Sequence, residues 1–297
     1  VKEITFNKEF HIAEDFKITC IKDGFYDSAL YVKTPDKKIL NLNDCEINTE
    51  KKAKQIKKIC GVCDILLTQF SYAAWKGGKE NLSWRINAAE KKIDSIKLQI
   101  EIFKPKILIP FASYIFFSNL KNYYLNDRAN TPKDIMKKIN KNDLSVAIMK
   151  PYDEFIDDYK TKKSSEAIEY WEDKYSLVSS KTLHTFDTIE KNELNTSFKK
   201  YIDRIFKKNS KFMIFLARYL SPISVFKKIV IFLDDIDETV VVDLLSNELV
   251  YKNLEPDLVM SSESFNFILN NSFGFDTLTV NGCFEEKAKE GFLKSTK

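Results

Sequence analysis

Residues 38–45 read KILNLNDC, residues 63–75 read CDILLTQFSYAAW, and residues 106–114 read KILIPFASY. These three stretches decide the fold. Each holds an apolar run short enough for a buried strand, and each run ends in polar or aromatic residues. Because a helix is predicted before each of the last two runs, the order favours a layered α/β domain with one functional edge.

Five side chains at the ends of these runs are candidate site residues. Asp44 follows the first run; Ser71, Tyr72 and Trp75 follow the second; Tyr114 follows the third. Hydroxyl groups and ring faces suit a sugar or a nucleotide base, so we predict that the last four line a substrate site. The residues alone leave another interpretation open, in which Asp44 ends a strand and the aromatic rings pack their loops over the core.

The order of these motifs resembles the second half of the metallo-β-lactamase-like domain of CMP-N-acetylneuraminate hydroxylase and its bacterial relatives, over roughly residues 17–150. The resemblance implies the later portion of a four-layered αββα sandwich. It places Asp44 where that superfamily has an aspartate that bridges two metal ions. We therefore predict an α/β to α+β chain, with a partial metallo-β-lactamase-like sandwich followed by a smaller α+β domain.

The sequence also departs from that superfamily. Its first metal motif, His-x-His-x-Asp-His, lies upstream of the matched region, and the chain has only His11 and His184. The last metal-binding histidine of related hydrolases is here Phe111 or Ala112, as in the hydroxylase-like branch. Since the chain begins with Val1, we expect a fragment of a longer protein. Two divalent ions, zinc or iron, are expected in the full-length protein and none in this fragment alone.

Two classes of function follow from these observations. The first is a metal-dependent enzyme, either a hydrolase or a hydroxylase, that acts on a sugar nucleotide or a surface-sugar precursor; the fragment alone is expected to be inactive. The hydroxylase precedent also requires a Rieske cluster, whose paired Cys and His ligands are absent from this sequence. The alternative is a metal-free binding module for a lipid or a protein partner.

Composition narrows the partners. The chain has 297 residues, 44% of them hydrophobic and 30% charged, which is enough for a full core and about two domains. A net charge of +4 is too small over this length to indicate a nucleic-acid partner, and we predict a small-molecule substrate instead. Five cysteines, an odd number outside a short secreted framework, indicate a reducing compartment, so we predict a cytoplasmic protein.

We predict three segments: the partial sandwich over 1–150, a charged helical connector over 151–206, and a small α+β domain over 207–297. Turn signals at Asp23-Gly24 and Pro35-Asp36 indicate two successive hairpins. Helices are predicted over residues 50–60 and 83–103, with another that begins at Thr131-Pro132.

The last segment is predicted to form strands over 229–233, 240–244 and 249–251, another strand after Pro256-Asp257, a helix that ends at Leu269, and a closing strand over 277–280. This layout of a hairpin followed by a helix weakly resembles sterol-carrier-like modules, in which helix and sheet enclose an apolar slot.

Three further features have a chemical and a structural interpretation. Cys60 and Cys63 have redox-motif spacing, but we favour a helix stop at Gly61 flanked by buried thiols. Two acidic groups could bind a cation, although solvated loops are the favoured interpretation; they are Asp153, Glu154, Asp157 and Asp158, and the run Asp234-Asp235-Ile236-Asp237-Glu238.

Residues 198–206 and 211–219 are predicted to form amphipathic helices that stop at Ser221-Pro222. The apolar region 212–233 is interrupted too early by basic residues for a membrane span. We expect it to pack inside the protein, and a membrane-surface helix is the alternative left open.

Overall fold

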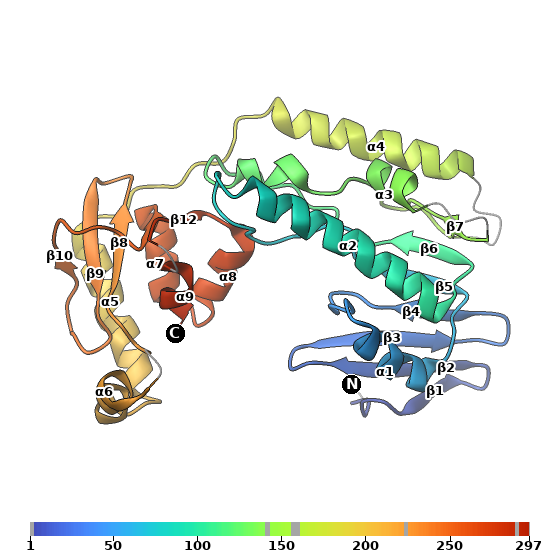
Figure 1. Cartoon of the computed structure of the whole chain (residues 1–297), viewed down its shortest axis with the longest axis horizontal. Coiled ribbons are helices and arrows are strands. Elements are labelled where there is room, and N and C mark those ends of the chain that lie inside the picture. Colours follow the sequence, from blue (N-terminus) through green and yellow to red (C-terminus); the bar gives the residue numbers. More distant parts are fainter. Residues whose placement is uncertain (1–2, 140–142, 156–160, 223–224, 289–290, 297) are drawn as a thin grey trace. The chain divides into compact units, whose positions relative to one another are not determined.

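The computed structural model describes residues 3–139, 143–155, 161–222, 225–288 and 291–296 (Figure 1). Contacts divide the chain into two compact units. The first unit holds residues 1–73, 83–116 and 127–181, and the second unit holds residues 74–82, 117–126 and 182–297. The predicted division into 1–150, 151–206 and 207–297 stays a prediction; the two units interleave along the chain, with boundaries elsewhere.

The first unit is built on a sheet of seven described strands in the order β1-β2-β3-β4-β5-β6-β7. They are β1 (Glu9–Ala13), β2 (Phe16–Asp23), β3 (Asp27–Lys33), β4 (Lys38–Asn41), β5 (Ile65–Thr68), β6 (Ile107–Pro110) and β7 (Ser145–Val146). β1 to β4 pair antiparallel, and β4 to β7 pair parallel. The predicted turn at Gly24, which has φ +59°, and the predicted strands β4 to β6 are confirmed.

Helices connect the parallel strands of this sheet, and one further helix follows the last strand. The connecting helices are α1 (Glu50–Cys60), α2 (Leu82–Phe103), the 3-10 helix η1 (Tyr123–Arg128) and α3 (Pro132–Lys138); α4 (Thr161–Ser179) follows β7. Thr49 caps α1 by accepting from the N–H of Lys52, and Thr131 forms a capping box with Asp134 at the start of α3. The predicted starts of both helices are therefore confirmed. Residues 111–122, between β6 and η1, form no α-helix.

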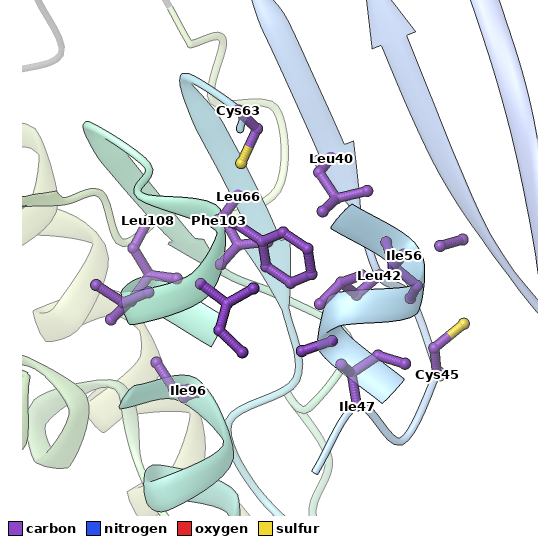
Figure 2. Close-up of a cluster of buried hydrophobic side chains, with 14 of the residues drawn as sticks. Leu40, Leu42, Cys45, Ile47, Ile56, Cys63, Leu66, Ile96, Phe103 and Leu108 are labelled. Atoms are coloured by element: carbon purple, nitrogen blue, oxygen red, sulfur yellow. The ribbon is translucent and has the colours of Figure 1, made fainter. Parts of the chain in front are cut away.

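α1 and α2 cover one face of the sheet (Figure 2). Leu40, Leu66 and Leu108, one from each of β4, β5 and β6, point to this face and meet Ile96 and Phe103 of α2. All five are completely or almost completely buried. Because strand side chains alternate, the neighbouring residues point to the opposite face.

That opposite face is also apolar. Ile65, Ile109 and Ala147 are buried there, and partly buried side chains surround them. The latter include Ile39, Leu67 and Ile107, from the same three strands. The sheet therefore has two apolar faces, and the described residues fully cover only the first.

The second unit holds a sheet in the order β10-β9-β8-β11-β12. Its elements are α5 (Lys191–Phe206), α6 (Lys211–Leu220), β8 (Ile229–Leu233), β9 (Glu238–Val242), β10 (Val250–Tyr251), β11 (Leu258–Met260), α7 (Ser262–Asn270), α8 (Gly274–Asn281), β12 (Phe284–Glu286) and α9 (Gly291–Thr296). β8 pairs antiparallel with β9 and parallel with β11. Hairpin and helix follow the predicted order.

One predicted element of this unit is wrong. Residues 277–280, expected as the closing strand because Thr and Val favour strands, lie in helix α8, and the closing strand is β12. Asn281-Gly282, which resembled a hairpin turn, ends the helix: Gly282 has φ +71° and its N–H donates to the carbonyl of Leu278. Tertiary packing therefore overrides local strand preference in this segment.

The predicted helix stop at Gly61 is confirmed. Gly61 has φ +73°, and its N–H donates to the carbonyl of Lys57 at 2.7 Å. Cys60 and Cys63 are buried free thiols. Burial raises the pKa of Cys60 to about 11 and that of Cys63 to about 12. Both thiols stay protonated at neutral pH, which removes the nucleophile that a redox pair needs.

Among the described residues, no helix combines the length and the apolar character needed to cross a membrane.

Candidate functional site

The carboxyl ends of β4, β5 and β6 lie at one edge of the first sheet, because these strands are parallel neighbours. Asp44 follows β4 in a tight turn. The N–H of Asn43 donates to Oδ1 of Asn41, and the N–H of Cys45 donates to the carbonyl of Leu42, both at 2.9 Å. Cys45 is buried and Asp44 is exposed. The buried Cys45 therefore anchors the turn in the core, and the carboxylate of Asp44 faces solvent.

A relay of two side-chain hydrogen bonds, from Lys92 to Gln69 and from Gln69 to Asp44, orients this carboxylate. Nε2 of Gln69, the residue after β5, donates to Oδ1 of Asp44. Nζ of Lys92, on α2, donates to Oε1 of Gln69 at 2.7 Å and lies 3.6 Å from Oε1 of Glu46. In the described part of the chain, Oδ2 of Asp44 accepts no hydrogen bond. One carboxylate oxygen is thus oriented, and the other is available to a ligand.

Ser71 and Tyr114 are brought together in a buried network around Phe70. Oγ of Ser71 accepts from the N–H of Asn130 at 2.8 Å, and Oγ of Ser113 accepts from the N–H of Phe70 at 3.0 Å. The ring of Tyr114 packs edge-to-face on Phe70, with 5.0 Å between centroids. Ser71 is buried, so its hydroxyl ties loops together in this conformation. Its contact with a substrate stays a prediction.

Tyr114 is half-buried, and its hydroxyl donates to the carbonyl of Pro110 at 3.2 Å. Its ring stacks on Trp171 of α4 with 4.2 Å between centroids and 17° between planes. Trp171 in turn donates from Nε1 to the carbonyl of Met149. This aromatic pair fastens α4 to the loop after β6, and a substrate role for Tyr114 stays a prediction.

Tyr72 lies beside an ion pair that the sequence analysis did not single out. Arg85 of α2 is buried and forms a two-pronged contact with Asp127: Nε to Oδ1 is 2.8 Å and Nη2 to Oδ2 is 2.9 Å. Burial raises the pKa of Tyr72 well above its ordinary value, and the Asp127 carboxylate adds to the shift. Helix periodicity places Arg85 near the buried face, but its distant partner cannot be read from local sequence.

Trp75 belongs to the second unit. Its ring centroid lies 4.7 Å from that of Phe284 and 5.0 Å from that of Phe292, and its backbone N–H donates to the carbonyl of Thr279 at 2.9 Å. These contacts give the ring a packing role. Its assignment to a substrate site with Asp44 stays a prediction.

A metal centre does not fit the described residues by themselves. Within the described ranges, no group of three His, Cys, Asp or Glu side chains is placed to hold a metal ion. Asp44 is joined by an amide rather than by ligands of its own type. His11 lies on β1 beside Glu9, and His184 forms a backbone bridge with Asn119. Asp44 could therefore supply one ligand of a centre, with the rest coming from elsewhere.

The acidic groups are engaged in protein contacts. Asp153 pairs with Lys150 at 2.6 Å; Asp157 and Asp158 lie outside the described residues. In the turn after β8, Asp234 pairs with Lys121. Asp235 accepts from the backbone and the hydroxyl of Ser262, which fixes the start of α7. These partners favour the structural interpretation of both groups.

The second unit contains an apolar pocket of about 130 Å³. Strand residues Ile231, Val242 and Met260 form one wall, and Phe265 and Ile268 of α7 contribute another. Its polar contributors are Tyr201, Lys227 and Ser295. The pocket lies between the sheet and helices of this unit; the sterol-carrier-like resemblance stays a prediction.

Comparisons with known proteins give little more. No family model matches the sequence, and no curated protein matches it. Two solved structures of CmlA were found. A β-hydroxylase mutant has a TM-score of 0.29 and 7% identity, with 37% of this chain and 25% of that chain covered. The diiron β-hydroxylase from Streptomyces venezuelae has a TM-score of 0.29 and 8% identity, with 58% and 31% covered.

This chain thus spans about a quarter to a third of the length of the CmlA chains. A TM-score of 0.29 is too low to carry an argument about fold or function. The structure itself shows mixed α/β architecture, and the metallo-β-lactamase resemblance stays a prediction.

Proposed function

We propose that the first unit is the second half of a metallo-β-lactamase-like αββα sandwich and supplies Asp44 to the metal centre of a metal-dependent enzyme. The observation that carries this proposal is the geometry of Asp44. Its carboxylate is exposed at the carboxyl edge of parallel strands and is oriented through one oxygen by Gln69. Ligand sites of open α/β sheets lie outside that edge. The remaining metal ligands come from outside the described residues.

The two-faced sheet supports the sandwich part of the proposal. In a sandwich, a second sheet packs against the face that the helices leave uncovered. Ile39, Leu67 and Ile107 form a partly buried apolar row on that face. An apolar sheet face in contact with water is unfavourable, so a covering layer is expected there.

The substrate class is proposed from the sequence resemblance. It is a sugar nucleotide or a surface-sugar precursor, and the reaction is hydrolysis or hydroxylation. Lys92 and Gln69 are proposed as positioning residues, because their relay sets the direction of the Asp44 carboxylate.

Metal content of the natural gene product tests the proposal. We expect about two divalent ions per chain and their loss in Asp44→Ala, because the carboxylate that would hold them is removed. Asp36→Ala, at an exposed aspartate in the turn before β4, is the matched control and should keep the metal. The proposal would be disproved if the Asp44→Ala protein retained all of its metal, or if the natural gene product contained no metal.

A second function is favoured by the pocket of the second unit. We propose that it binds an apolar or amphiphilic small molecule, because ten or more carbon-rich side chains enclose it and a lysine lies in its lining. This is the metal-free binding module of the sequence analysis, and it can operate in the same protein as a metal centre.

Displacement of the fluorescent probe N-phenyl-1-naphthylamine by a fatty acid tests this second function. We expect saturable probe binding that Val242→Trp weakens at least tenfold, because the indole fills the pocket. Val250→Trp, at an exposed valine of the neighbouring strand β10, is the control. Equal probe binding in both variants, with native circular dichroism spectra, would show that the probe binds elsewhere.

A further inference from the structure

Helix α6 presents its apolar side chains to solvent. Phe212, Met213, Phe215, Tyr219 and Leu220 are between 48% and 74% exposed. At 100° per residue these five positions fall within one half of the helix circumference. A continuous apolar face on a ten-residue helix is unlike the scattered exposed apolar residues of an ordinary surface. The expectation that this region packs inside the protein is therefore wrong for these five side chains.

The opposite side of α6 is held against the unit. Ile214 is buried, and the Arg218 side chain, 8% exposed, reaches Asp243 with 2.9 Å between Nη1 and Oδ1. Lys228 approaches the other oxygen of Asp243 at 3.4 Å. The inward side thus carries a buried ion pair while the outward side is apolar. This contact fixes the rotation of the helix, so the apolar face cannot turn inward without breaking it.

Lysines flank the apolar face. Lys207, Lys208 and Lys211 are exposed at and before the start of α6, and Lys227 and Lys228 are exposed after its end. Neither the first turn nor the last turn of the helix itself contains an acidic residue. An apolar helix face flanked by exposed lysines is the pattern of helices that lie in the interface of an anionic bilayer.

We propose that α6 docks this protein on an anionic membrane surface, with its apolar face among the acyl chains and the five lysines at the lipid phosphates. A two-fold contact between two copies is disfavoured, because it would bring the lysines of both copies together. The same charges are complementary to anionic lipid headgroups. Two lining residues of the apolar pocket, Phe226 and Lys227, follow this helix closely in the sequence, so a docked protein would have a lipid source near the pocket.

Flotation of the whole chain with lipid vesicles tests the proposal. One set of vesicles contains phosphatidylcholine alone, and the other contains 30% phosphatidylserine, a composition chosen for the test. We expect binding to the anionic vesicles, a loss of at least tenfold at 0.5 M salt because the charges are screened, and much weaker binding to the neutral vesicles.

Two sets of variants separate the apolar and the charged contributions. Phe212→Ser with Phe215→Ser should abolish vesicle binding, whereas Phe25→Ser with Tyr26→Ser, at an even more exposed aromatic pair in the first unit, should not.

For the charges, Lys207, Lys208 and Lys211 are changed together to Gln, which should reduce binding at least tenfold. The control changes three exposed lysines of the first unit, Lys51, Lys58 and Lys91, to Gln. Equal losses in this pair of variants would mean that net charge alone attracts the protein and would overturn the proposal.

Sedimentation of the lipid-free protein completes the test. A monomer that floats with anionic vesicles supports the proposal. A stable dimer that Phe212→Ser with Phe215→Ser dissociates, together with no vesicle binding, would overturn it and assign the face to a second copy of the chain. Circular dichroism and melting temperatures check that every variant is folded.

Discussion

Helices α2 and α6 both place apolar residues at helical spacing, and they use them in opposite ways. On α2, Ile93, Ile96 and Ile100 are buried against the first sheet. On α6, the residues at corresponding spacing face solvent, and an ion pair faces inward. Periodicity predicts that a helix has an apolar face. It does not predict what covers that face, because the covering surface is distant in the chain or belongs to another molecule.

The largest expected effect comes from removing the same side chain from each helix. Phe103→Ala, at the buried end of α2, should lower the free energy of unfolding by about 3–5 kcal/mol, because it leaves a cavity. Phe212→Ala, at the exposed face of α6, should change it by less than about 0.5 kcal/mol. Urea unfolding measures both, and similar losses would break the comparison.

The next effect concerns a buried and an exposed ion pair of α2. Arg85→Met leaves Asp127 without its guanidinium partner and should cost roughly 2–3 kcal/mol of unfolding free energy, at the low end for a buried pair because Asp127 is a third exposed. Lys97→Met, which removes an exposed pair with Asp94 on the same helix, should cost less than about 1 kcal/mol. Equal losses of unfolding free energy in the two variants would show that burial does not strengthen the contribution of the Arg85 ion pair.

The ion pair between Arg218 and Asp243, which holds α6, should make the free energy of unfolding depend on pH. Burial raises the pKa of Asp243, but the N–H of Leu245 and the Arg218 guanidinium outweigh it and hold the pKa below the usual value of an aspartate. A lowered folded-state pKa stabilises the protein above the unfolded value and loses that contribution as pH falls. Asp243→Asn should therefore cost roughly 1–2 kcal/mol at pH 7, and the difference from the wild type should shrink below about pH 4. A constant difference would contradict this origin.

The smallest effect comes from the helix caps. Thr49→Ala should lower the free energy of unfolding by about 1 kcal/mol, because α1 belongs to the buried core. Ser210→Ala removes the equivalent cap of α6. Because few contacts hold α6, we expect less than about 0.5 kcal/mol in global unfolding and faster amide exchange confined to residues 211–220. If Ser210→Ala instead accelerated amide exchange in α1, the prediction that α6 opens locally would be wrong.

Local signals predicted much of the first unit. Turn residues fixed both hairpins, a threonine cap and a glycine stop bounded α1, and short apolar runs marked β4 to β6. These features depend on interactions within a few residues. The closing strand of the second unit was mispredicted, because residues 277–280 favour a strand locally and a helix in their tertiary environment.

The candidate site was less predictable. The sequence indicated that Asp44 follows a strand, but not that Gln69 and Lys92 orient it, since those contacts join residues 25 and 23 positions apart. It placed Ser71 and Tyr72 at a substrate edge, and both are buried. Polar and aromatic residues after a strand serve loop packing as readily as ligand binding, and only burial separates the two uses.

The interleaving of the two units affects how the protein can be dissected. The chain passes from one unit to the other at residues 73, 82, 116, 126 and 181. A clone that stops at residue 181 would encode the whole first sheet, yet Trp75 would lack the rings of Phe284 and Phe292. Truncation at a boundary between the units would therefore leave one unit incomplete, with apolar side chains exposed to solvent. Recombination of this sequence with another would preserve the contacts within each unit only when both units come from the same parent.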